Sequence, residues 1–330
     1  MRPWLIPLLI ALLLGVIAAR MLIGGVSTAN PEILHTLLQL RASRIASGII
    51  AGGSLALAGA LLQSLLRNPL ASPDLLGLSS GAGLGVMIAI YASFLAGFGL
   101  ADAGGLWGVG STTAAIIASC LTLALVYTLA RRGFSISPTS LVLMGVIIAI
   151  IASALISLLK HLMPDQGVAA DRLLVGNLRD DTSLTQLILT GTLLVAGVCF
   201  ATSQAKAMDV ASVSDEEASS LGVDVAKLRI MQFLIAGVLT GGAVVLAGPV
   251  AFVGLLCPHM IRSLAGPKAR RILIGSAILG ALTIVAADTL IAIILELRPG
   301  FGRLPLGILT ALAGGPIFLL MLRRSPATQP

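Results

Sequence analysis

Ten apolar stretches, each about as long as a membrane-spanning helix, take up most of this 330-residue chain. About 20 mainly apolar residues of helix are needed to cross the roughly 30 Å hydrocarbon core of a bilayer. The eighth stretch is short and contains Pro258, which favours a broken or half-buried helix inside the bundle. The predicted spans are 3–23, 45–66, 74–98, 109–130, 138–160, 182–204, 228–248, 250–265, 271–295 and 305–323.

Composition indicates the same fold class. Only 11% of the residues are charged and 57% are hydrophobic, whereas a soluble domain carries roughly a quarter of charged residues to cover its surface. The chain is therefore predicted to be an all-α integral membrane protein with one transmembrane domain over residues 1–330. No metal site is expected, because the three cysteines, Cys120, Cys199 and Cys257, lie far apart within apolar segments.

Lysine and arginine residues set the predicted orientation, because they concentrate in cytoplasmic loops. With ten spans and a cytoplasmic N-terminus, most of the 21 Lys and Arg residues fall on the cytoplasmic side. Both ends of the chain are therefore predicted to be cytoplasmic. The remaining arginines, on the outer side, call for a separate explanation.

A polar stretch over 203–229 separates the sixth and seventh spans and is predicted to be cytoplasmic. Within it, Ser214 can cap a short helix, Glu217 stands at the third position of a capping box, and Gly222 can end the helix in a left-handed turn. Two interpretations remain open at this point. The helix lies on the inner face of the membrane, or it docks a cytoplasmic partner.

The two halves of the chain resemble each other. At a constant offset of 189, ten of the thirty positions over 48–77 are identical to their counterparts, among them Gly52 with Gly241 and Pro69 with Pro258. Many transporters pack two related halves of opposite topology around a central pathway. We therefore expect two related halves in this fold.

Three long blocks then identify a family resemblance. They read LAGALLQSLLRNPLASPDLLGLSSGAGLG over 57–85, AGPVAFVGLLCPHMIRSLAG over 247–266 and LPLGILTALAGGPIFLLMLRR over 304–324. They resemble the signatures of the FecCD-type permeases, the iron-siderophore, haem and vitamin B12 importers of the ABC class. The resemblance extends from about residue 40 to the C-terminus.

The resemblance implies a type II ABC importer permease in the bacterial cytoplasmic (inner) membrane, crossing the bilayer several times. Its expected cargo is an iron chelate, a ferric siderophore first and haem or cobalamin next. The expected partners are a second copy of the chain, two ATP-binding-cassette ATPase subunits, a periplasmic or lipoprotein substrate-binding protein and lipid, with no nucleic acid. No enzymatic activity and no cofactor are expected in this subunit, since Mg-ATP belongs to the partner ATPase and no GxxxxGK[ST] loop is present here.

The resemblance also implies roles for particular residues. The segment VSDEEASSLG over 213–222 matches the family's coupling helix, within a loop of about 205–228. The expected ATPase contacts are Asp215, Glu216, Glu217, Leu221 and Gly222. The expected positions along the cytoplasmic gate and translocation path are Asn68, Leu70, Pro138 and Thr139.

Outer arginines have an implied role as well. Family members carry a motif like RLPR before the second span, and this chain has Arg41-Ala42-Ser43-Arg44 there. A third docking arginine fits Arg298 or Arg303 before the last span. All four are expected to lie outside the membrane and to contact carboxylates of the binding protein, which speeds and orients association more than it adds affinity.

Asp288 lies inside the ninth predicted span, where an ionisable side chain must face the protein interior or a partner. A structural hydrogen bond to a neighbouring helix end is the favoured interpretation. The alternative function, an ion-coupled secondary transporter, needs intramembrane carboxylates or a sodium site, and Asp288 is its plausible candidate. A membrane-embedded enzyme is less well supported, because the spans contain no paired carboxylates, HExxH motif or Ser–Lys set.

Overall fold

The computed structural model describes residues 4–23, 31–96, 104–132, 135–136, 138–163, 175–180, 182–298 and 302–324. Each of the ten predicted spans corresponds to one helix, which confirms the all-α membrane fold. These helices are α1 (Leu5–Leu22), α2 (Pro31–Leu65), α3 (Leu78–Leu95), α4 (Gly104–Ala130), α5 (Pro138–His161), α7 (Leu184–Ser203), α10 (Val225–Ala247), α11 (Val253–Ala265), α12 (Ala269–Leu297) and α13 (Leu306–Arg324). In the described part of the chain, eight of them are long and apolar enough to cross a membrane, and α11 and α13 are shorter apolar helices.

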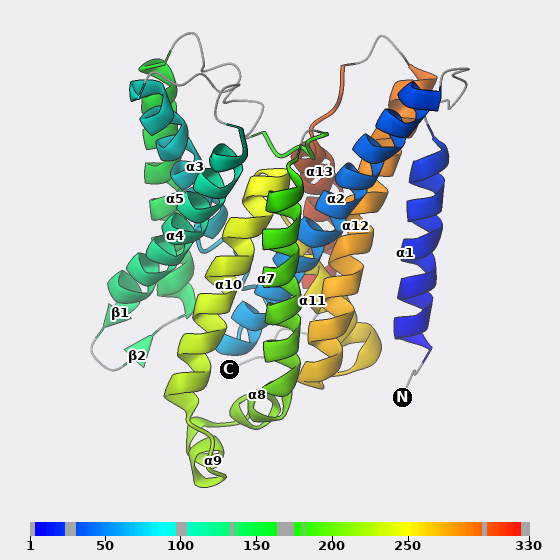
Figure 1. Ribbon diagram of the computed structural model, residues 1–330. Helices are drawn as coiled ribbons and strands as arrows, with labels where there is room; N and C mark the ends of the chain where they lie inside the picture. Colours follow the sequence, from blue (N-terminus) through cyan, green and yellow to red (C-terminus); the bar gives the residue numbers. More distant parts are fainter. Residues whose placement is uncertain are drawn as a thin grey trace.

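The bundle has two distinct ends (Figure 1). At one end lie the start of α1, the two short helices α8 (Ala205–Ala211) and α9 (Asp215–Ser220), and a small hairpin of β1 (Arg131–Arg132) and β2 (Ser135–Ile136). The predicted orientation makes this the cytoplasmic end, and we call it the inner end. The opposite, outer end carries residues 175–180 and the start of α13, joined by a hydrogen bond from the Gly307 amide to the Gly176 carbonyl.

Helix α2 is longer than the sequence analysis predicted. It begins at Pro31 instead of residue 45, so Arg41 and Arg44 lie within the helix and not in a loop before it. Proline suits the first turn of a helix, because the amide it lacks would have had no partner there. No glycine or proline follows until Gly48, so nothing ends the helix at the polar residues.

The two related halves are visible in the packing. Helix α2 packs against α11 and α12, and its counterpart α10 packs against α3 and α4. The two helices run in opposite directions along the bundle (Figure 1), since α2 ends and α10 begins beside α9. The halves are thus inverted with respect to each other, as in many transporters.

Glycines let these helices touch through their backbones. A Cβ on Gly52 of α2 would overlap the carbonyl of Gly280 in α12, and a Cβ on Gly59 would overlap the backbone of Gly254 in α11. In the other half, a Cβ on Gly241 would lie 2.6 Å from the Ile116 Cα. Helices in lipid associate by such close contact because no hydrophobic force distinguishes a helix from the lipid around it.

A compact corner joins α2 to α3. Helix α2 ends at Leu65, and Arg67 follows with a left-handed backbone (φ 47°) before Pro69. Helix α3 begins at Leu78, four residues later than predicted, because Pro73 opens a turn that Gly77 closes with φ 73°. The left-handed backbone at Gly77 is one that only glycine adopts at little cost.

Candidate functional site

A buried ion pair joins α2 to α12 near the outer end. The Nε of Arg44 donates to Oδ1 of Asp288 at 2.7 Å, and the two side chains are 1% and 3% exposed. Arg20 of α1 donates through its own Nε to Oδ2 of the same carboxylate, also at 2.7 Å. Asp288 therefore holds three helices together, and the hydrogen bond to a helix end that the sequence suggested is instead a double ion pair with two arginines.

Arg44 also reaches toward the outer surface. Its Nη1 donates to Oδ1 of Asp180 at 2.8 Å and to the carbonyl of Leu178, and its Nη2 donates to Asn177. The second oxygen of Asp180 accepts from Nη1 of Arg303 at 2.8 Å. Successive ion pairs therefore connect the buried Arg20, through Asp288, Arg44 and Asp180, to Arg303 at the surface.

The electrostatics of Asp180 follow from these contacts. Partial burial acts to raise the pKa of its carboxyl, but the charges and hydrogen bonds of Arg44 and Arg303 outweigh that effect and hold the pKa below its ordinary value. Asp180 therefore stays ionised at neutral pH and links the buried and the exposed arginine.

The four arginines expected to dock a binding protein differ in position. Arg298 and Arg303 are exposed, and the side chain of Arg303 is 35% exposed. Arg41 is half-buried and donates to the carbonyl of Met21 at 2.8 Å. Arg44 is almost completely buried among its partners, so the structure contradicts the expectation that it faces outward. The reason is its place inside α2, where its side chain points at Asp288.

At the inner end, α9 has the predicted form. The Ser214 hydroxyl accepts from the Glu217 amide at 3.0 Å and caps the helix, and Gly222 ends it with φ 81°. Glu216 and Glu217 are exposed, and Leu221 is 71% exposed. The expected coupling residues therefore present an acidic and apolar surface away from the bundle (Figure 1).

Asp215 differs from its acidic neighbours because it is engaged within the chain. Its Oδ1 accepts from Arg67, just after α2, and from Arg229 of α10 at 2.9 Å. Arg67 also donates to the carbonyl of Ala211 at the end of α8. Asp215 thus anchors α9 to one helix from each half of the fold.

The residues expected to form the gate lie at the corner after α2. The Asn68 side chain accepts from the Leu70 amide at 2.9 Å and fixes the turn. This corner packs on α5, where a Cβ on Gly145 would lie 2.6 Å from the Leu76 Cα. Pro138 and Thr139 begin α5, but their side chains lie outside the described part of the structure. The gating role of all four remains a prediction.

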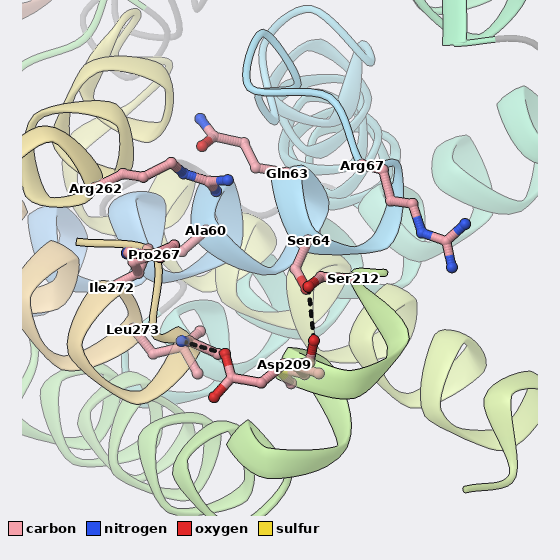
Figure 2. Close-up of a pocket in the computed structure, with 12 residues that line it drawn as sticks. Ala60, Gln63, Ser64, Arg67, Asp209, Ser212, Arg262, Pro267, Ile272 and Leu273 are labelled. Carbon is pink, nitrogen blue, oxygen red and sulfur yellow. Dashed lines mark hydrogen bonds between the residues drawn. The ribbon is translucent and has the colours of Figure 1, made fainter. Parts of the chain in front are cut away.

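A polar cavity of about 270 Å³ lies beside this corner (Figure 2). It is lined by residues of α2, α8, α11 and α12 and of the turn before α12. Its polar lining consists of Gln63, Ser64, Arg67, Asp209, Ser212 and Arg262. The cavity therefore joins the connecting segment of α8 and α9 to the inner ends of three long helices.

Sequence reasoning missed Asp180, Arg20 and the polar lining of this cavity. Arg20 gave one signal in the sequence. An arginine at the outer end of a span opposes the usual bias of positive charge toward the cytoplasmic side, which suggests that it has a partner. Asp180, Gln63 and Asp209 gave no such signal in the sequence, because their partners lie far away along the chain. Asp209, for example, accepts a hydrogen bond of 2.7 Å from the amide of Ala269.

Comparison with known proteins agrees with this architecture. The chain is 32% identical over 298 residues to the hemin transport system permease protein HmuU of Yersinia pestis, covering 90% of this chain and 86% of that protein. It is 34% identical to the Fe(3+)-citrate import system permease protein YfmE of Bacillus subtilis, covering 98% and 96%. It is 31% identical to the vitamin B12 import system permease protein BtuC of Vibrio cholerae, covering 96% and 93%.

A solved structure has the same fold. A chain of a metal-chelate type ABC transporter in an inward-facing conformation superposes with a TM-score of 0.80 at 28% identity, covering 98% of this chain and all of that one. The model of the FecCD transport family matches residues 5–324. The all-helical membrane fold of the described residues, the projecting α8–α9 segment and these matches lead to one conclusion: the chain is a multi-pass permease component of an ABC importer and belongs to the FecCD transport family.

Proposed function

We propose that this permease imports a metal chelate, an iron chelate such as a ferric siderophore or ferric citrate first and haem or the cobalt complex cobalamin next, across a bacterial cytoplasmic membrane. The relatives named above carry hemin, ferric citrate and vitamin B12, and the similar solved chain belongs to a transporter of metal-chelate type. All of these cargoes are metal complexes held by an organic ligand. The proposed class of cargo rests on these relatives. The subunit is proposed to move the metal complex across the membrane without altering it chemically.

The observation that carries the proposal is the placement of contact surfaces at opposite ends of one bundle. At the inner end, the Glu216 and Glu217 side chains on α9 and Leu221 just after it are exposed. We assign this surface to an ATP-binding-cassette subunit, with Gly222 ending the helix and Asp215 orienting it. Two ATPases and two copies of this chain then form the transporter around a shared pathway.

At the outer end, Arg303 and Arg298 are the exposed members of the four expected docking arginines. We assign them to carboxylates of a substrate-binding protein, periplasmic or lipid-anchored, and Arg41 to a supporting position at the edge. The gate between the two ends is assigned to the corner of Asn68 and Leu70 and to the start of α5.

The geometry of Asp288 disfavours the alternative of an ion-coupled transporter. Such a carrier needs a carboxylate that gains and loses a proton or a cation during the cycle. Both oxygens of Asp288 are instead held by arginines at 2.7 Å. A carboxylate neutralised in this way serves structure rather than ion exchange.

The test is reconstitution in proteoliposomes. The chain is co-expressed with candidate ATPase and binding-protein subunits from its host, and uptake of radiolabelled ferric citrate, a ferric siderophore, haem and cobalamin is measured with and without ATP. We expect ATP-dependent uptake of one chelate, a complex with two copies of each subunit, and no ATP hydrolysis by the purified chain alone. Hydrolysis by the isolated chain, or uptake driven by an ion gradient without ATP, would contradict the proposal.

A further inference from the structure

Two buried polar atoms in the cavity at the inner end have no partner. The amide oxygen Oε1 of Gln63 and the Nε of Arg262 are inaccessible to solvent and, within the described part of the chain, make no hydrogen bond. Gln63 is 1% exposed, and its other polar atom, Nε2, donates to the Leu255 carbonyl at 3.2 Å. An unpaired buried acceptor or donor costs free energy, so a ligand in the cavity that pairs with both atoms would remove that cost.

The charge of Arg262 points to an anion. Arg262 is half-buried and forms no ion pair with any described carboxylate. A guanidinium partly withdrawn from water is stabilised when hydrogen-bond acceptors surround it, and most strongly when one of them is an anion. Its planar fork of N–H donors fits phosphate and carboxylate groups best.

The opposite wall of the cavity carries a negative charge. Figure 2 shows Gln63 and Arg262 on one side of the cavity and Asp209 on the other. Asp209 accepts one hydrogen bond, through Oδ1, from the Ala269 amide at the start of α12 at 2.7 Å. A simple anion would meet repulsion from this carboxylate, so the ligand must offer a hydrogen-bond donor or a positive charge as well.

We propose that the cavity binds a phosphate ester that carries a primary amine, the chemistry of a phosphoethanolamine group. Its phosphate accepts from Arg262, and its ammonium donates to Gln63 Oε1 and to the Asp209 carboxylate. The cavity of about 270 Å³ has room for such a group. It lies beside the last turn of α2 and the first turn of α12, at the inner end of two membrane-spanning helices, and basic pockets between spans on the cytoplasmic side are known to bind lipid headgroups.

Two sources can supply this group, the headgroup of phosphatidylethanolamine or a soluble phosphoethanolamine. Native mass spectrometry of the delipidated full chain, incubated with phosphatidylethanolamine or phosphatidylcholine of equal acyl chains, tests the first. Phosphatidylcholine has the same phosphate but no N–H donor. Titration with O-phosphoethanolamine, followed by the melting temperature with inorganic phosphate as reference, tests the second.

We expect the parent to retain phosphatidylethanolamine over phosphatidylcholine. Arg262→Gln should lower that retention at least about tenfold, the loss of one charge-assisted hydrogen bond, and Asp209→Asn should remove the preference between the two lipids. Arg270→Gln is the matched control, because Arg270 is exposed and does not line the cavity. Arg262→Lys keeps a charge without the fork and should retain an intermediate amount, which separates a lost contact from a misfolded chain.

Protection by O-phosphoethanolamine without retention of the lipid would keep the site and identify a soluble ligand. The proposal would be overturned if the parent and Arg262→Gln retained both lipids equally and O-phosphoethanolamine did not raise the melting temperature. Water would then be the occupant of the cavity.

Discussion

Arg44 and Asp288 form a buried ion pair between the two inverted halves, with Nε and Oδ1 at 2.7 Å and neither side chain more than 3% exposed. Asp288→Asn should destabilise the chain by about 3–5 kcal/mol, because it leaves the charges of Arg44 and Arg20 without their counter-ion. Thermal unfolding in detergent measures this. Glu296→Gln removes an exposed carboxylate about two turns further along α12 and should leave the melting temperature nearly unchanged. Equal melting temperatures for parent and Asp288→Asn would show that the pair is not structural.

Asp180 should make the stability of the outer end depend on pH. Its pKa is lower in the folded chain than its ordinary value of about 3.9, so the stabilisation is fully present above that value and is lost as pH falls through the folded pKa. The melting temperature of the parent should exceed that of Asp180→Asn at pH 7, and the difference should begin to shrink only as pH falls below about 4. A gap that stays constant with pH would mean that the charge of Asp180 is not what stabilises the loop.

Backbone contact between helices predicts a steric limit at Gly59. Any side chain there would overlap Gly254, and overpacking a tight contact costs at least about 1–3 kcal/mol. Gly59→Leu should therefore abolish the monodisperse peak in fluorescence-detected size exclusion. Gly15→Leu in α1, where nothing lies within 4 Å of a Cβ, is the control and should fold normally. A stable Gly59→Leu protein would refute the packing of α2 on α11.

Reversing charge on α9 tests the inner contact surface. Glu216→Lys combined with Glu217→Lys should weaken capture of the ATPase without altering insertion, because both side chains are exposed and like charges on a docking surface reduce association. Pull-down with the tagged ATPase measures this, and Glu296→Lys at the outer end serves as the charge control. Unchanged capture by the double variant would place the ATPase elsewhere.

Arg303 is the outer arginine whose loss should affect docking most directly. Arg303→Glu should slow association of the binding protein, and the difference from the parent should shrink as salt rises, since exposed charges are screened over about 10 Å at 0.1 M. Surface plasmon resonance at two salt concentrations measures the rates. Arg44→Gln should instead lower stability, as its guanidinium is buried. Equal association rates for parent and Arg303→Glu at low salt would remove Arg303 from the docking surface.

Much of the fold could be predicted from the sequence, because the length and apolarity of a span are local properties. The cap at Ser214 and the left-handed turn at Gly222 were predictable for the same reason. The start of α2 was not predicted, since the polar and charged residues scattered through 32–44 suggested a loop, whereas no glycine or proline there ends the helix. The burial of Arg44 depends on Asp288, 244 positions away in sequence, and no local pattern reveals such a partner.

The two ion pairs of Asp215 have a mechanical consequence. The same oxygen accepts from Arg67 at the end of α2 and from Arg229 near the start of α10, and these are corresponding helices of the two inverted halves. Through this one carboxylate, a displacement of α9 would act on both halves at the same point. Because α2 and α10 run in opposite directions, that displacement would be directed toward the C-terminus of one helix and toward the N-terminus of the other.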